Sequence, residues 1–184
     1  MTQETFIEDL EIDKLWFSEN FKEFFKGVNV DGGNESFLNR RYFSLKETKI
    51  SARTLNSWYK NNILNDDRIG GKGWSKFSFS ELLWIGIVKE LRNFGFSLKK
   101  IKIVKVYLES LNTEKYDSKF VLIDFYFYAG VKFGTPMKLI VFSEGKTILS
   151  RQTAIDSAIQ SQIISGNYCL LYTSDAADDL LCVD

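Results

Sequence analysis

The alternation of hydrophobic and polar positions between residues 42 and 111 predicts four short helices separated by turns. Apolar residues recur every three or four positions, which is the spacing of one helix face. Four serines stand where helices should begin: Ser44, Ser51, Ser78 and Ser97. A serine at this place accepts a backbone N–H of the first turn, so the predicted helices cover residues 45–48, 51–61, 78–94 and 97–111.

The helix over residues 51–61 is predicted to have one polar side. Leu55 and Trp58 point toward the core, and four polar residues share the opposite side: Arg53, Asn56, Ser57 and Lys60. Arginine pairs with guanine and asparagine with adenine, while lysine and serine bind phosphates. The stripe is therefore typical of a helix that reads base edges, although an ordinary solvated face has the same spacing.

Residues 68–76, RIGGKGWSK, follow this helix and predict a basic hairpin. Gly70, Gly71 and Gly73 can adopt positive φ at its tip. The basic residues of the segment are Arg68, Lys72 and Lys76. Such a hairpin can lie along phosphates or a minor groove, and its place between the helices indicates a winged helix-turn-helix.

Residues 42–106 resemble the MerR family of bacterial transcription regulators. The family's V-S-x-x-T-L-R-Y-Y corresponds to ISARTLNSWY at 50–59, its G-Y-R-x-Y-S to GWSKFS at 73–78, and its G-F-S-L-x-x-I to GFSLKKI at 95–101. Two arginines of the family pattern are replaced here, one by Asn56 and one by Ser75.

This resemblance implies a mainly α fold with small β elements and a sequence-specific regulator that binds double-stranded DNA. The helix would enter the major groove, the wing would follow the backbone, and the protein would act as a homodimer with an unknown small-molecule effector. The residues expected to contact DNA are Ser51, Arg53, Thr54, Asn56, Ser57, Lys60, Arg68, Lys72 and Lys76. The family's long dimerisation helix is not expected, because Asn112 and the charged segment TEKYDSK interrupt the helical pattern.

The flanking regions carry less information. Residues 1–41 form an acidic, aromatic extension, in which Ser18 would cap a helix with a stripe of Phe21, Phe24, Phe25 and Val28; this helix either covers the core or serves in docking. Residues 42–112 make the DNA-binding domain and 113–168 a small α+β accessory or dimerisation segment. Within it the β-branched and aromatic residues of 120–133 favour a strand, but polar Asp124, Tyr128 and Lys132 at steps of four also suit the polar face of a helix, and we expect the helix. A β-hairpin over 137–150 and a helix over 151–162 are expected to follow.

Charge supports a polyanion partner. The chain has no net charge, yet residues 40–106 hold fifteen basic and five acidic residues, a concentration typical of nucleic-acid binding. No nucleophile–base pair, metal cluster or phosphate loop is evident, so we expect neither an enzyme nor a cofactor. No apolar run could span a membrane, and the acidic N-terminus is unlike a signal peptide, so we expect a cytoplasmic protein.

Residues 169–184 are interpreted as a non-native tail. Back-translated, CLLYTSDAADD at 169–179 resembles the mosaic end and adapter of a transposase-based sequencing library. Both cysteines, Cys169 and Cys182, lie there, and the chain has no histidine. We therefore expect this tail to have no part in the native fold, and we expect no disulfide framework and no metal sensing through thiolate or imidazole.

Two other functions remain open. An excisionase-like architectural protein of a mobile element would use the same winged fold to bend DNA. A winged helix can also serve in protein–protein contact alone, since a fold does not determine a function.

Overall fold

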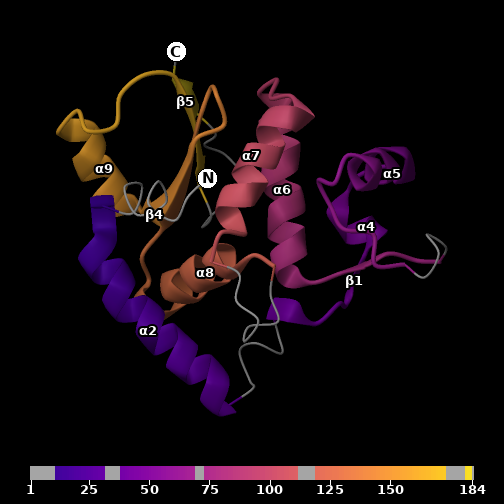
Figure 1. Ribbon diagram of the computed structural model, residues 1–184, viewed down its shortest axis with the longest axis horizontal. Helices are drawn as coiled ribbons and strands as arrows, with labels where there is room; N and C mark the ends of the chain where they lie inside the picture. The colour runs from indigo at the N-terminus through magenta and orange to yellow at the C-terminus, as the bar shows by residue number, and fades with distance from the viewer. Residues whose placement is uncertain (1–10, 32–37, 69–72, 112–118, 173–180, 184) are drawn as a thin grey trace.

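The computed structural model describes residues 11–31, 38–68, 73–111, 119–172 and 181–183, which are mostly helical with two small sheets (Figure 1). The helices are η1 (Glu11–Asp13), α2 (Lys14–Asp31), α4 (Leu45–Thr48), α5 (Ala52–Lys60), α6 (Phe79–Asn93), α7 (Leu98–Leu108), α8 (Val121–Phe133) and α9 (Gln152–Gln160). The strands are β1 (Phe43–Ser44), β2 (Lys76–Phe77), β3 (Met137–Phe142), β4 (Thr147–Arg151), β5 (Tyr168–Tyr172) and β6 (Leu181–Val183).

The serine caps predicted from the sequence are confirmed. Ser44, Ser51, Ser78 and Ser97 each accept a backbone N–H of the following helix. Capping boxes complete the starts of α4 and α6, where Glu47 and Glu81 bind back to the cap backbone. Because each cap satisfies N–H groups that a helix leaves free, these local signals position the helix starts.

The predicted hairpin over residues 68–76 has its tip, with Gly70, Gly71 and Lys72, outside the described residues. Its second arm forms β2, which pairs antiparallel with β1, matching Phe43 with Phe77 and Ser44 with Lys76. The chain on the first arm is not a strand at residues 64–68. The two-stranded sheet therefore joins the segment before α4 to the segment before α6.

The C-terminal part is a layered α+β arrangement. Its sheet has the order β4-β3-β5-β6 with antiparallel neighbours, and β3 and β4 form the expected hairpin. Ile155 and Ala158 of α9 pack with Ile140 and Ile148 in a small core of their own. The helix expected over 120–133 is confirmed as α8.

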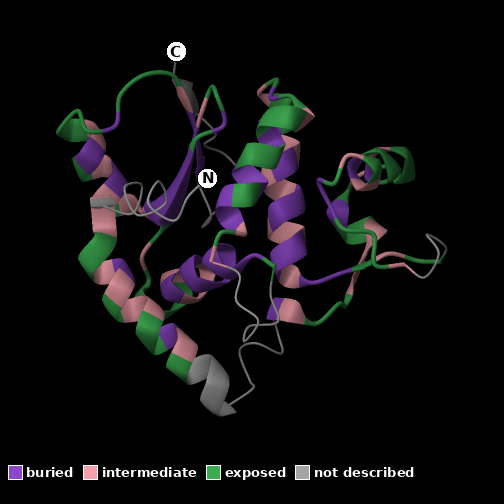
Figure 2. Cartoon of the chain, in the orientation of Figure 1, coloured by how far each residue is buried: buried purple, intermediate pink, exposed green. Residues whose placement is uncertain are grey.

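One main core joins the helix-turn-helix to the α+β part. It contains Leu55 of α5, Trp84 of α6, Val104 of α7, Phe125 of α8 and Leu139 of β3, all at most 3% exposed. In Figure 2 the buried residues gather where α6, α7, α8 and the sheet meet, and the outer sides of these elements are exposed. The core therefore contains residues from both sides of the boundary at residue 113, which the sequence predicted between the DNA-binding domain and the accessory segment. The domain boundaries themselves stay predictions.

Two expectations about the polar residues of α2 and α8 are wrong. Ser18 lies inside α2, not at its start, and its hydroxyl donates to the carbonyl of Leu15. Asp124 does not face solvent, because it is 1% exposed and binds Ser80 of α6. Burial of the carboxylate is compensated by this hydrogen bond, so periodicity alone misassigned its environment.

The aromatic side of α2 covers the core. Phe17 and Phe24 are buried, and their rings lie 5.1 and 5.7 Å from the ring of Phe125. The side chain of Val28 lies outside the described residues. Asp13, just before α2, binds Arg151 through two hydrogen bonds of 2.6 and 2.5 Å, which fastens this N-terminal element to β4.

Residues 169–184 were interpreted as a non-native tail and were given no place in the fold. In the structure, strands β5 and β6 include residues of this segment. Tyr168–Tyr172 forms the inner strand β5 between β3 and β6, and Leu170 and Leu171 are buried. Cys169 is disulfide-bonded, contrary to the expectation of no disulfide. A continuous run of apolar and aromatic residues suits a strand that is buried inside a sheet, whatever its origin.

Candidate nucleic-acid interface

Helix α5 presents the polar stripe that the sequence predicted. Leu55 and Trp58 are 3% and 5% exposed and fix the orientation of the helix against the core. The opposite side carries four exposed residues: Arg53, Asn56, Ser57 and Lys60. Ser51 and Thr54 differ from these, because their hydroxyls lie 2.9 Å apart and Ser51 also caps the helix.

The turn after α5 is held by two other helices. The indole Nε1 of Trp84 in α6 donates to the carbonyl of Ile63 at 2.8 Å. The ammonium of Lys105 in α7 donates to the carbonyl of Asn62 at 3.1 Å and to Oδ1 of Asn65 at 3.3 Å. Asn62 has a φ of +55°, and these bonds satisfy carbonyls that the end of a helix leaves free.

Sequence reasoning did not give Trp84 and Lys105 this positioning role. In the sequence, Trp84 was interpreted only as an apolar residue of a buried helix. The signal for Lys105 was its place on the apolar face of α7, where a charged side chain needs buried partners.

Tyr59 connects α5 to the chain before β2. Its hydroxyl donates to Oγ of Ser75 at 3.0 Å, and the guanidinium of Arg68 lies over its ring at 4.9 Å. Burial raises the pKa of Tyr59, so the hydroxyl keeps the proton that this hydrogen bond requires. The segment after α5 is thus fastened to the helix on both sides of the undescribed residues 69–72.

Arg68 is engaged within the chain. Its Nε and Nη2 donate to the two carboxylate oxygens of Asp66 at 2.7 and 2.6 Å, the bidentate geometry that also suits a phosphate. These hydrogen bonds lower the pKa of Asp66. Arg68 is therefore paired with a carboxylate within the chain, and its contact with DNA stays a prediction.

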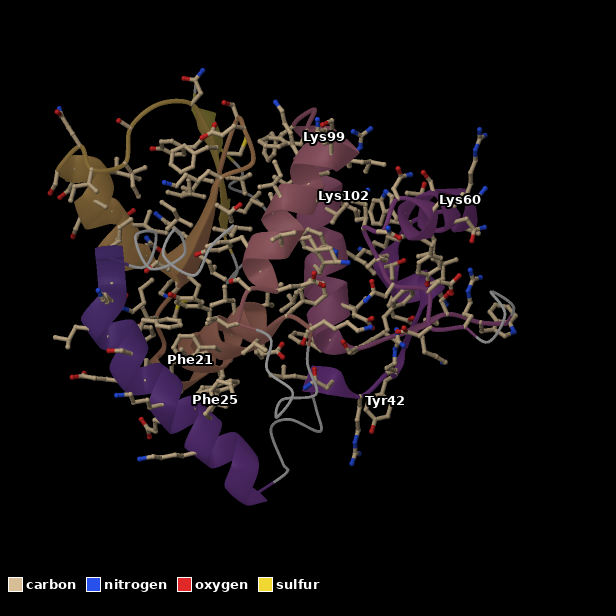
Figure 3. All side chains as sticks on the ribbon, in the orientation of Figure 1. Phe21, Phe25, Tyr42, Lys60, Lys99 and Lys102 are labelled. Carbon is tan, nitrogen blue, oxygen red and sulfur yellow. The ribbon has the colours of Figure 1, made fainter. Side chains whose placement is uncertain are left out.

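The other cations of the region divide into two sets. Arg41 is committed to Glu81, with distances of 2.9 and 3.1 Å, and to Asp67. A second set is exposed and has no ion pair with a carboxylate in the described ranges: Lys46, Lys49, Arg53, Lys60, Lys76, Lys99 and Lys102. Figure 3 shows Lys60 at the outer end of α5 and Lys99 and Lys102 on α7.

The unpaired set lies on or next to α4, α5, β2 and α7. Charges without protein partners are available to an external polyanion, and together they attract one over a distance of about a Debye length. Lys72 was also expected to contact DNA, and it lies outside the described residues.

Residues 45–105 match the family model described as MerR HTH family regulatory protein. This segment is a MerR-type helix-turn-helix domain. It comprises α4 to α7 with β2, and it includes Trp84 and Lys105, which hold the turn after α5. The MerR family is a regulatory, DNA-binding family and is not typically enzymatic. No curated protein and no solved structure matches the chain.

Two further features of the described ranges concern metal ligands and membrane-spanning helices. No group of three or more potential metal ligands occurs among these residues. None of their helices is long and apolar enough to cross a membrane.

The engagement of Arg68 leads to a prediction. Asp66→Ala should free the guanidinium for a phosphate, strengthen DNA binding and steepen its salt dependence by about 0.9 in logarithmic slope. Glu90→Ala is the matched control, since it removes the same charge from a carboxylate that has no ion pair in the described residues and leaves the Asp66–Arg68 pair intact. Binding titrations at several salt concentrations measure both slopes; equal slopes for the two variants would show that Arg68 does not reach DNA.

Proposed function

We propose that the protein is a sequence-specific transcription regulator that binds double-stranded DNA through α5 and the residues around it. The observation that carries the proposal is the stripe of exposed Arg53, Asn56, Ser57 and Lys60 on a capped, well-anchored helix of a MerR-type segment. A helix in the major groove reads bases with a few such side chains.

The proposed roles follow from exposure and chemistry. Arg53 and Asn56 read base edges, because their planar groups can form two hydrogen bonds with one base. Ser57, Lys60 and Lys76 bind phosphates, which orient the helix and carry no sequence information directly. Ser51 and Thr54 contribute mainly by capping α5, and the wing with Lys72 lies on the flanking backbone, with Arg68 joining it when released from Asp66.

The oligomeric and cellular context is also proposed from the resemblance. We infer a cytoplasmic bacterial homodimer that binds an inverted repeat and responds to an effector of unknown identity. Helix α7 ends at Leu108, so a dimer would need contacts other than one long helix continuing from α7.

The proposal is tested by fluorescence anisotropy of the full chain with duplexes tiled across the upstream region of its own gene. Random duplexes of equal length serve as controls, at 50 and 200 mM salt. We expect tight, selective and salt-sensitive binding to one duplex. Salt-sensitive binding without selectivity would support the excisionase-like architectural role instead, and absence of binding at both salts would leave protein–protein contact.

Arg53→Ala should reduce base discrimination. We expect a loss of about 1–3 kcal/mol on the selected duplex, the usual contribution of a bidentate base contact, and a smaller loss on random DNA. Lys60→Ala is the matched control on the same helix and should weaken both complexes about equally. Equal losses on selected and random DNA for Arg53→Ala would contradict its role as a base reader.

A further inference from the structure

Arg40 and Tyr42 form an exposed pair just before β1. Nη1 of Arg40 donates to the hydroxyl oxygen of Tyr42 at 2.9 Å, and the backbone N–H of Tyr42 donates to the carbonyl of Arg40 at 3.2 Å. The backbone bond makes a tight turn that holds the two side chains together. Tyr42 is 59% exposed, although a tyrosine ring usually buries most of its surface.

The neighbouring arginine shows what is unusual about this pair. Arg41 is neutralised by the carboxylates of Glu81 and Asp67. Arg40 has no carboxylate partner in the described part of the chain, and its one protein partner is a neutral hydroxyl. A guanidinium has five N–H donors, so most of the hydrogen-bonding capacity of Arg40 is open to solvent.

The strand register relates the pair to the proposed DNA surface. Ser44 lies opposite Lys76 in the β1–β2 ladder, and directly opposed residues share a face of a sheet. Phe77, on the other face, is buried. Tyr42 is two residues before Ser44, so the alternation of side chains places it on the exposed face with Lys76.

In Figure 3, Tyr42 lies below Lys60, in the half of the view that also holds α5.

We propose that Arg40 and Tyr42 bind a backbone phosphate of the DNA that flanks the groove occupied by α5. Arg40 supplies the charge, and Tyr42, whose oxygen accepts from Arg40, has its own O–H left to donate to the same phosphate. The pair lies before residues 45–105, so it would lengthen the contact beyond the MerR-type segment. This inference rests on the proposed function.

The test compares Arg40→Ala, Tyr42→Phe and Lys22→Ala with the wild-type full chain on the selected duplex, at salt concentrations from 50 to 200 mM. Lys22 is an exposed cation of α2, far along the chain from this surface, and serves as the control for loss of one charge. Arg40→Ala should weaken binding about ten-fold at 50 mM salt and about three-fold at 200 mM, because one phosphate contact adds about 0.9 to the logarithmic slope.

Tyr42→Phe should weaken binding roughly two- to ten-fold by losing one neutral hydrogen bond, with little change of slope. Thermal unfolding of each variant separates these effects from misfolding.

The outcomes distinguish the two proposals. If the wild-type chain binds the duplex, and Arg40→Ala has the same affinity and salt slope as Lys22→Ala, then Arg40 does not bind a phosphate. That result would overturn the role of Arg40 and would not affect the proposal that the protein is a regulator. A wild-type chain that binds no DNA at either salt would overturn both. Ethylation interference at a phosphate outside the α5 footprint, present with wild type and lost with Arg40→Ala, is the expected positive result.

Discussion

Trp84→Ala should lower the free energy of unfolding by about 3–5 kcal/mol, the range for truncating a large buried aromatic side chain. Trp84 is completely buried in α6, its ring lies 5.6 Å from that of Phe120, and its indole N–H binds the carbonyl of Ile63. The substitution therefore removes core packing and leaves a buried carbonyl without its donor. Urea unfolding followed by circular dichroism measures the loss.

The same substitution should reduce DNA binding at temperatures where the variant is still folded, because Ile63 lies in the turn that ends α5. Trp84→Phe isolates the hydrogen bond, since it keeps an aromatic ring and removes the N–H. We expect it to lose about 1–3 kcal/mol of stability. If Trp84→Phe is as stable as the wild type and binds DNA equally well, the bond to Ile63 does not position α5.

A chain that ends at Tyr168 should be less stable than the full chain by about 3–6 kcal/mol. Truncation removes Leu170 and Leu171 from the core, and burial of each leucine contributes about 1.5–3 kcal/mol. It also exposes the edge of β3, which pairs with β5 from Lys138 to Phe142, and an unpaired edge favours aggregation.

A chain that ends at Tyr172 is the control, because it retains β5. Both truncated chains and the full chain are compared by urea unfolding under reducing conditions, so that the disulfide of Cys169 does not enter the comparison. Equal stability of the full chain and the chain ending at Tyr168 would show that β5 contributes nothing, as expected of the foreign tail inferred from the sequence.

Local signals in the sequence predicted the helix-turn-helix well. Serine caps at Ser51 and Ser78 depend only on side chains within one turn of the helix start, so they could be read directly. The separation of α5 into a buried and a polar side follows from helical periodicity and is confirmed by burial of Leu55 and Trp58.

Signals that depended on distant residues were misread. Asp124 stands at the spacing expected of a polar face. It is nevertheless buried in the core, where it accepts a hydrogen bond from the hydroxyl of Ser80, forty-four positions earlier. The pairing of Arg68 with Asp66 was also missed, although only two positions separate these residues, because it depends on how the chain bends there. The DNA contacts themselves remain predictions.

The sequence by itself determined where the helices begin, which side of α5 is polar, and that a basic segment resembling the MerR family occupies residues 42–106, because caps, periodicity and charge are properties of neighbouring residues. Only the tertiary structure decided which cations are available and what holds α5. Arg41 binds Glu81, which lies forty positions away along the chain, whereas its neighbour Arg40 binds only the hydroxyl of Tyr42 among the described residues. Trp84 and Lys105 reach the end of α5 from two other helices, and contacts of this kind arise only when a shared core brings distant segments together.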